Sequence, residues 1–243
     1  MTVTANSTLT GAFGATSTTV VKSIPSVPAG ATLVLGILDR SDETTTISGI
    51  SDDVNGAWTL NYVAGPVDST NQTYRCWQAY RNNCAAGTTN VTVTFNTAIN
   101  SQLAVAYITS DQGEMTFDAA ATVYHSAGAE TNVDSLTATA TGAGAIVGFL
   151  CTNNSQTDPE PTADGAGESR ITSGQAGARA FLFFETYTGS GSYGIETTGD
   201  SSIAMLMVGA FKESAASSSI APLASRNFRA PGALFGPSGL GRK

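Results

Sequence analysis

The chain carries few side chains of the types that act in catalysis. Its one histidine, His125, is followed by Ser126, and an imidazole is the usual group that activates a serine nucleophile. However, the sequence contains no Gly-x-Ser-x-Gly turn of the kind that presents such a serine. We therefore interpret His125 as a surface residue at the end of a strand, and we expect no catalytic residue and no enzymatic activity.

Carboxylates are the second kind of catalytic group that the sequence offers, because two of them can cleave a glycosidic bond. Residue types alone leave the separation of these groups open. A polysaccharide-degrading enzyme is therefore the third of three hypotheses for this chain. The candidate carboxylates are Asp52, Asp53, Asp111, Glu114 and Glu185.

In the segment SDDVNG, the side-chain oxygens of Asp52, Asp53 and Asn55 could bind calcium. The twelve-residue EF-hand pattern is absent, and short polar side chains in such a segment more often form a turn that caps a hairpin. We favour the turn over the ion. The three cysteines form no Cys-x-x-Cys pair, which argues against zinc and favours buried, reduced thiols. We expect no metal and no cofactor.

Aromatic residues suggest a different kind of site. Trp58, Tyr62 and Trp77, with Tyr80, could form a platform on which a sugar stacks if their rings face solvent. Aromatic residues at alternating strand positions more often belong to the core. Both interpretations remain open, and the first three residues are the possible glycan-binding residues.

Composition indicates which elements must position these residues. The chain has 243 residues, of which 41% are hydrophobic and only 12% charged, and it is rich in threonine, valine, glycine and serine. Such a composition is typical of short strands joined by turns. We predict an all-β fold over residues 1–213: an antiparallel, jelly-roll-like β-sandwich with an extended C-terminal arm.

Individual stretches support the strand prediction. In TTNVTVTFN, Val91, Val93 and Phe95 point one way and the threonines the other, which is the period of a half-buried strand. The stretch 203–211 is apolar on both faces, so we expect a central strand or one buried against a second subunit. The polar stretch NNSQTDPEPTADGAGES is predicted to be a long exposed loop.

The order of features from residue 31 to about 152 resembles a family of jelly-roll β-sandwich modules found in phage virion proteins and in bacterial surface proteins. The matching pieces are ATLVLGILDR, ISGISDDVNGAWTL, YRCWQAYRNNCAAGTTNVTVTF, LAVAYIT and AIVGFLCTNN. The family usually places glycine before asparagine in its Asp-containing turn, whereas this chain has Asn55 and then Gly56. The resemblance implies a role in assembly or adhesion.

Charge is distributed unevenly along the chain. Residues 1–213 contain all 19 acidic and 7 of the 11 basic residues, a net charge of −12, whereas the 4 basic residues of 214–243 give +4. An acidic body repels nucleic acid and anionic membranes. We therefore expect neither as a partner of the body.

The C-terminal stretch 214–243 combines prolines, glycines, apolar residues and basic residues. Its prolines forbid a regular helix and favour an extended path, and a merely solvated tail would rarely carry so many apolar side chains. We predict an arm that attaches the body to a partner; a disordered end is the alternative. The predicted assembly residues are Arg226, Phe228, Arg229, Leu234, Phe235 and Leu240.

Reduced thiols, an acidic sandwich and a cationic arm favour a protein that is assembled in a host cytoplasm and displayed on the outside of a virion. Our leading hypothesis is a non-enzymatic structural protein of a tailed phage or phage-like particle. A capsid decoration, cement or head-spike protein is favoured over a tail component, with other virion proteins, such as the capsid protein, as partners. We expect a homo-oligomer, with a trimer as the first choice. The alternative is a glycan-binding adhesin or a tail-associated receptor-binding protein that touches host surface glycan.

Overall fold

The computed structural model describes residues 3–10, 16–39, 44–68, 75–111, 114–125, 130–152, 160–163, 169–175, 178–201 and 204–214. All strands in these ranges pair antiparallel with their neighbours. The same ranges hold no helix, and hence none that could span a membrane. The prediction of an all-β, β-sandwich-like fold is confirmed.

Two sheets are built from the first half of the described chain. Sheet A contains, in order, β1 (Val3–Thr10), β9 (Ser101–Ser110), β3 (Ala31–Asp39), β7 (Arg75–Cys84) and β6 (Asn61–Asp68). Sheet B contains, in order, β2 (Ser17–Ser23), β8 (Asn90–Ile99), β4 (Ile47–Asp52) and β5 (Gly56–Ala57).

The second half forms two further sheets. Sheet C contains, in order, β10 (Met115–His125), β17 (Ala204–Glu213), β12 (Gly144–Thr152), β15 (Ala178–Tyr187) and β14 (Ser169–Gln175). Sheet D contains, in order, β11 (Glu130–Ala140), β16 (Gly191–Ser201) and β13 (Glu160–Ala163).

The two halves have the same strand order. Sheet C reproduces sheet A when β10, β17, β12, β15 and β14 are matched with β1, β9, β3, β7 and β6. Sheet D reproduces the β2-β8-β4 part of sheet B in the same way. We call residues 3–110 repeat 1 and residues 115–213 repeat 2. The body predicted over residues 1–213 thus contains two sandwiches of one topology.

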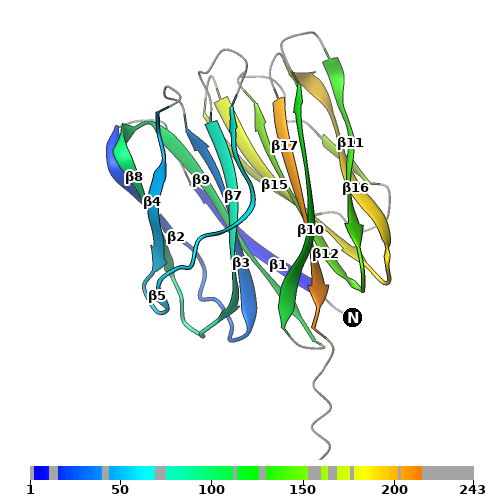
Figure 1. Ribbon diagram of the computed structural model, residues 1–243, viewed down its shortest axis with the longest axis horizontal. Helices are drawn as coiled ribbons and strands as arrows, with labels where there is room; N and C mark the ends of the chain where they lie inside the picture. The colour runs from blue at the N-terminus through cyan, green and yellow to red at the C-terminus, as the bar shows by residue number, and fades with distance from the viewer. Residues whose placement is uncertain are drawn as a thin grey trace, which may run out of the picture.

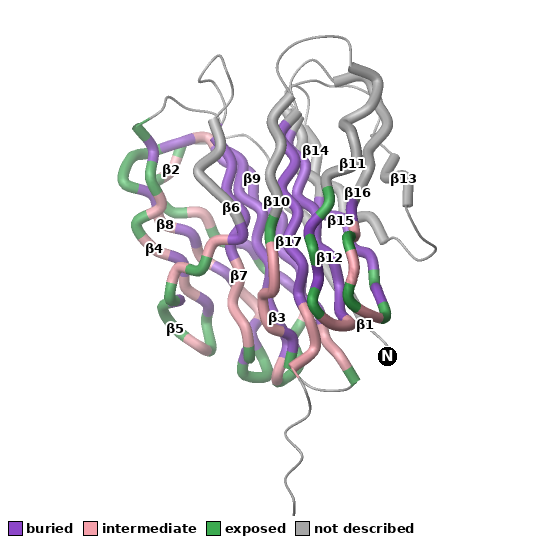
Figure 2. The backbone as a smooth tube through the Cα atoms, turned by 45° about the vertical axis from the view of Figure 1, so that its right-hand side comes forward, coloured by how far each residue is buried: buried purple, intermediate pink, exposed green. Residues whose placement is uncertain are grey.

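The sheets are stacked as four layers in the order B, A, C, D (Figure 1). Apolar side chains fill the space between each pair of layers: Leu35 and Val93 lie between A and B, Val34 and Phe149 between A and C. Between C and D, the third core includes Leu150, Leu206 and Ala138. The purple strands in the middle of Figure 2 are the members of the two inner sheets.

The inner position of sheets A and C explains why some strands are apolar on both faces. Every residue of β3 is buried, because its odd-numbered side chains face sheet B and its even-numbered ones face sheet C. Strand β17 pairs with both β10 and β12, so the prediction of a central last strand is confirmed. One face of β17 packs against the first repeat of the same chain rather than against a second subunit.

One loop prediction was wrong. Strand β13, Glu160–Ala163, lies inside the stretch that we predicted to be a long exposed loop. Its Pro161 cannot donate a ladder hydrogen bond, but β13 is an edge strand of sheet D with a single partner, β16, and an edge strand tolerates proline.

Candidate functional site

The carboxylate of Asp52 is the centre of a buried polar network at the end of β4. It accepts hydrogen bonds from the backbone N–H groups of Val54 (2.9 Å) and Asn55 (2.6 Å), and from the indole Nε1 of Trp58 (2.7 Å). The Asn55 amide and the Thr88 hydroxyl donate two further contacts to its Oδ1, at 3.0 and 3.3 Å. The bond to Val54 closes the Asx turn that the sequence favoured over a calcium site.

Burial and hydrogen bonding have opposite effects on Asp52. Burial alone would raise its pKa, but the hydrogen bonds from Asn55, Trp58 and Val54 hold the pKa below the ordinary carboxyl value of 3.8. The side chain is therefore ionised at neutral pH and surrounded by donors. It has neither the raised pKa nor the free oxygen that a general acid or a metal ligand needs.

The carboxylate of Asp53 also accepts several hydrogen bonds, in this case from residues at and just before the start of β8. It accepts hydrogen bonds from the backbone N–H and hydroxyl of Thr89, at 2.9 and 2.6 Å, and from Asn90 at 3.1 to 3.2 Å. Burial slightly opposes ionisation, and these hydrogen bonds lower the pKa well below its ordinary range. The two aspartates thereby hold the β4–β5 hairpin, with Gly56 at φ +70°, against the segment that precedes β8.

The other candidate carboxylates come from separate parts of the fold. Glu185 is buried on β15 of sheet C, whereas Asp111 and Glu114 are exposed and lie between β9 and β10. Among the described residues no group of three or more His, Cys, Asp and Glu side chains could hold a metal ion. The structure therefore does not bring the five carboxylates together into one site.

The possible glycan-binding residues lie in or against the core between sheets A and B. Trp58 and Trp77 are 7% and 2% exposed, and the ring of Trp77 lies 6.4 Å from that of Phe95. Tyr62 is half-buried and packs against the same core. A sugar-stacking platform requires rings that face solvent, and the two tryptophans do not meet this condition. They occupy the core position that was the alternative interpretation.

The remaining predicted residues are placed as follows. His125 is the last residue of β10, opposite Ala204 of β17, which is the strand end that we expected. Cys76, Cys84 and Cys151 are buried thiols that are not joined in disulfides, and burial raises the pKa of the Cys84 thiol to about 11. The six predicted assembly residues, Arg226, Phe228, Arg229, Leu234, Phe235 and Leu240, lie outside the described residues.

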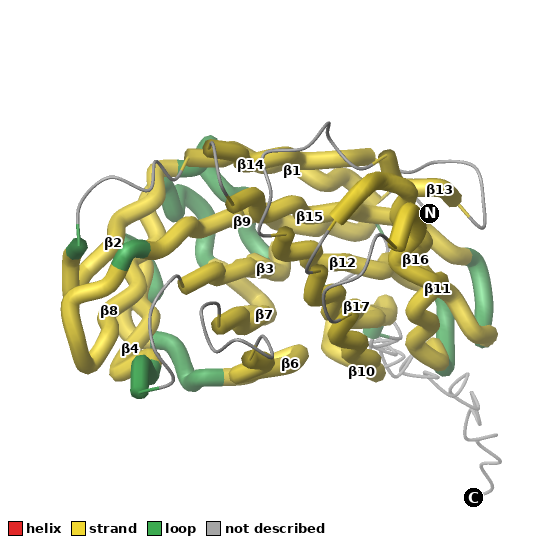
Figure 3. Tube along the Cα trace, turned by 90° about the horizontal axis from the view of Figure 1, so that it is seen from above, coloured by secondary structure: helices red, strands yellow, loops and turns green. Residues whose placement is uncertain are grey.

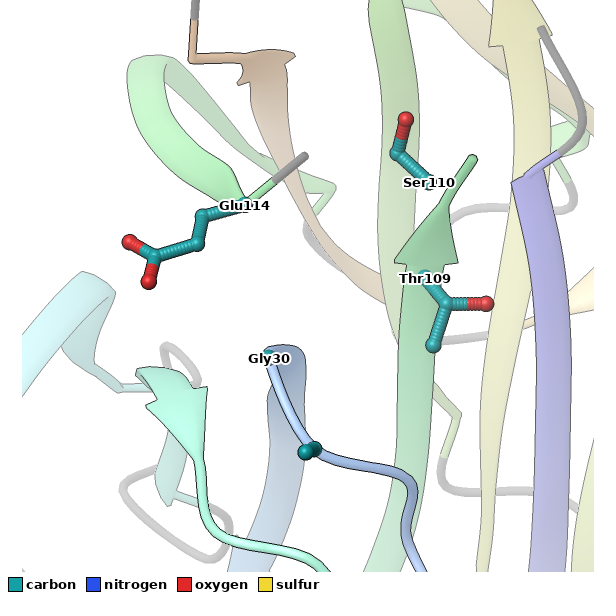
Figure 4. A pocket seen from close by; sticks show the side chains of 5 residues that line it. Gly30, Thr109, Ser110 and Glu114 are labelled. Atoms are coloured by element: carbon teal, nitrogen blue, oxygen red, sulfur yellow. The ribbon is translucent and has the colours of Figure 1, made fainter. Parts of the chain in front are cut away.

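The sequence did not indicate a pocket of about 240 Å³ that opens where the two repeats meet (Figure 4). It is lined by Ala29 and Gly30 before β3, Thr109 and Ser110 at the end of β9, and Glu114 before β10. The Ser214 backbone N–H donates to the Glu114 carbonyl oxygen at 2.7 Å, so the chain leaves the body beside this pocket. Because the pocket combines Ala29 and Gly30 with Thr109, Ser110 and Glu114, which lie far from them in the sequence, no local pattern could have revealed it.

The described surface of the body is poor in large apolar residues. Only Val21, at 58% exposure, and Val54, at 46%, are exposed large hydrophobic side chains in the part of the chain that the structure describes.

No family model, curated protein or solved structure matches this chain. The resemblance to phage virion modules therefore stays a prediction.

Proposed function

We propose that this chain is a non-enzymatic structural protein of a tailed phage or phage-like particle, and that it decorates, cements or forms spikes on the outside of the capsid. Its partners are other virion proteins, with the capsid protein first, and further copies of itself, with a trimer first. The arm over residues 214–243 is the attachment segment, and the body is the displayed part.

The observation that carries this proposal is the contrast between body and arm. In the described body, large apolar side chains are buried or half-buried apart from Val21 and Val54, and the carboxylates of Asp52 and Asp53 are already occupied by donors of their own repeat. Stable interfaces need apolar anchors in their centre. The sequence supplies such anchors, together with a net charge of +4, after residue 213.

Two further features support the proposal. The arm begins beside the exposed Glu114 at the junction of the repeats, so it leaves the body from one end. The order β1-β9-β3-β7-β6 of sheet A facing β2-β8-β4-β5 of sheet B supports the predicted jelly-roll-like architecture, which is used in viral capsids and lectins. Fold alone does not determine function, so the arm carries the argument.

Deletion of residues 215–243 tests the proposal. We expect the shortened chain to keep the thermal unfolding midpoint of the full chain but to be absent from particles purified from cells that express it. Two variants divide the effect of the arm: Phe228, Leu234, Phe235 and Leu240 changed to serine, or Arg226 and Arg229 changed to glutamine. Incorporation should fall most in the first variant, because desolvated apolar anchors contribute more than exposed charges.

Normal incorporation of the shortened chain would contradict the proposal. Binding of the isolated body to a glycan array, without any effect of the arm on particle assembly, would instead favour the adhesin hypothesis. Light scattering after size-exclusion chromatography gives the number of copies in each variant.

A further inference from the structure

We propose that the contact between sheets A and C is a two-fold subunit interface contained within one chain, and that the partner this face recognises is a second module of the same strand order. This inference does not depend on the proposed function. It rests on the way the two repeats face each other and on two close contacts across the interface.

The repeats face each other with their strand orders reversed, as two copies related by a two-fold axis would. Sheet A runs β1-β9-β3-β7-β6 alongside β14-β15-β12-β17-β10 (Figure 3). At one edge β1 contacts β14, and at the other edge β6 contacts β10, the strand that corresponds to β1. At each edge, a strand of one repeat therefore contacts the counterpart of the strand at the other edge of its own sheet. This reciprocal arrangement is that of an isologous interface.

The two central strands meet on this pseudo-axis. Strands β3 and β12 are counterparts, and they contact each other in the middle of the interface. Both begin at the same end of the molecule: Thr32 of β3 donates to the carbonyl oxygen of Met115 at 2.9 Å, and Glu213, opposite Met115, donates to the carbonyl oxygen of Ala143 just before β12. The axis therefore runs along the strands between β3 and β12.

At this crossing the two repeats differ in a complementary way. Gly36 of β3 lies directly against the ring of Phe149 of β12, and a Cβ at position 36 would overlap that ring. A reciprocal pair lies nearer the edge, where a Cβ at Gly209 of β17 would be 2.8 Å from Cγ1 of Val63 on β6. Each repeat therefore offers a glycine to a bulky side chain of the other.

These pairs make the interface specific for unlike repeats. If two copies of repeat 2 met in the same way, Phe149 would meet Phe149 at the axis, and two copies of repeat 1 would leave a void between two glycines. Both arrangements are costly, because cores tolerate neither overlap nor unfilled volume. The side-chain amide of Gln78 also donates across the interface to the Val147 carbonyl oxygen at 3.1 Å, which fixes the register of β7 against β12.

A cleavable form of the full chain tests this inference. A protease site is inserted between Gln112 and Gly113, and the protein is cut after it has folded. We expect the two pieces to elute together in a one-to-one ratio and with the mass of the uncut protein, because a subunit interface does not need the covalent link. Separation of the pieces, or self-association of either piece, would overturn the inference.

Substitutions on the two faces of β12 provide the matched control. Phe149→Ala removes a buried ring from the face toward sheet A and introduces no steric overlap. It should raise the dissociation constant of the cut complex by about a hundredfold. Ile146→Ala removes a buried side chain from the same strand but from the face toward sheet D, and should leave that constant within about threefold. Equal weakening by both variants would overturn the inference.

A double variant that restores binding completes the experiment. Gly36→Ala should weaken the cut complex by at least about tenfold, and the double variant Gly36→Ala with Phe149→Ala should bind more tightly than Gly36→Ala with an intact Phe149. If the two effects simply add, the pair does not meet at the axis and the inference fails.

Discussion

Buried polar residues of this protein hold turns and edges in place. The carboxylate of Asp52 receives donors from its own hairpin and from Thr88, which precedes the next strand, so one side chain satisfies several groups that would otherwise be buried without partners. Lys22 has a different position: it lies on β2, an edge strand, and its side chain points inward and is 2% exposed. An inward-pointing charge is one of the features by which edge strands resist pairing with other chains.

Asp52→Ala should lower the free energy of unfolding by about 3 kcal/mol at pH 7, because it leaves the Trp58 indole N–H and the Asn55 N–H without their acceptor. The folded pKa of Asp52 lies below the unfolded value. Its contribution is therefore complete above about pH 4 and is lost as the pH falls through the folded pKa. Urea unfolding at pH 7 and pH 3 measures this, and a gap to wild type that stays constant would contradict it.

Lys22→Met should reveal a pH dependence in the alkaline range. Burial lowers the pKa of Lys22 from 10.5 to about 8, so between these values the unfolded chain holds a proton that the folded chain has lost. Stability of the wild type relative to Lys22→Met should therefore rise from pH 8 to pH 10.5, by about 2 to 3 kcal/mol. The titration of Cys84 and the tyrosines affects the stability of both proteins equally and therefore cancels in this difference. A pH-independent difference would show that Lys22 is not desolvated.

Among the elements, the strands of sheet C are joined by side chains as well as by ladders. Tyr187 of β15 donates from its buried hydroxyl to the Phe211 carbonyl oxygen of β17 at 3.0 Å, across the intervening β12. Its ring also stacks on Tyr193 of β16, with centroids 4.4 Å apart, which links sheet C to sheet D.

Tyr187→Phe should destabilise repeat 2 by about 1 to 2 kcal/mol, because the ring and its stacking are kept while a buried carbonyl loses its donor. Tyr193→Phe is the matched control. Its hydroxyl donates to the nearby Gly189 carbonyl oxygen from a half-buried position, where water can replace it, so the loss should be smaller. Thermal unfolding of the two variants compares them, and an equal or larger loss in the control would refute the assignment.

Strand existence was predictable from local pattern, whereas strand partners were not. The alternation in 91–95 predicted the core of β8 correctly. The residues from Trp58 to Val63 favour a strand by their types, but the structure differs at the start of this stretch: β5 ends at Ala57 and β6 begins at Asn61, while Trp58 turns its indole toward Asp52. A polar partner six residues away outweighed the strand propensity of the aromatic residue, and a strand pattern contains no such information.

The strand order shared by the two repeats is accompanied by a similarity in sequence. GATLVLGIL, residues 30–38, and GAGAIVGFL, residues 142–150, share the spacing Gly-Ala-x-x-x-x-Gly-x-Leu. This alignment matches Gly36 with Gly148, yet Gly36 faces the other repeat and Gly148, by alternation with Phe149, faces sheet D. Both strands carry apolar residues on both faces. A one-residue difference in which side chains face the other repeat therefore cannot be recognised from their composition.

At the level of the whole molecule, the stacking of the four sheets explains why the two tryptophans do not form a solvent-exposed platform. Both large sheets are covered on each face by the chain itself, so their aromatic and apolar residues are used for folding. The sequence showed the tryptophans and the carboxylates but not that the folded layers would enclose both tryptophans, Asp52 and Glu185. The pocket beside Glu114 is lined by residues of repeat 1 and by Glu114 of the link to repeat 2, and it could be found only from the assembled fold.

The direction of the strands gives the molecule two different ends. Val3 pairs with Ser110, Met115 pairs with Glu213, and Ser214 follows directly, so the start of β1, the link between the repeats and the exit of the arm lie together. Strands β3, β10 and β12 all run away from that end. A peptide grafted after Asp39 or His125 would thus sit at the pole opposite Ser214, separated by the length of the strands from the point at which the chain leaves the body.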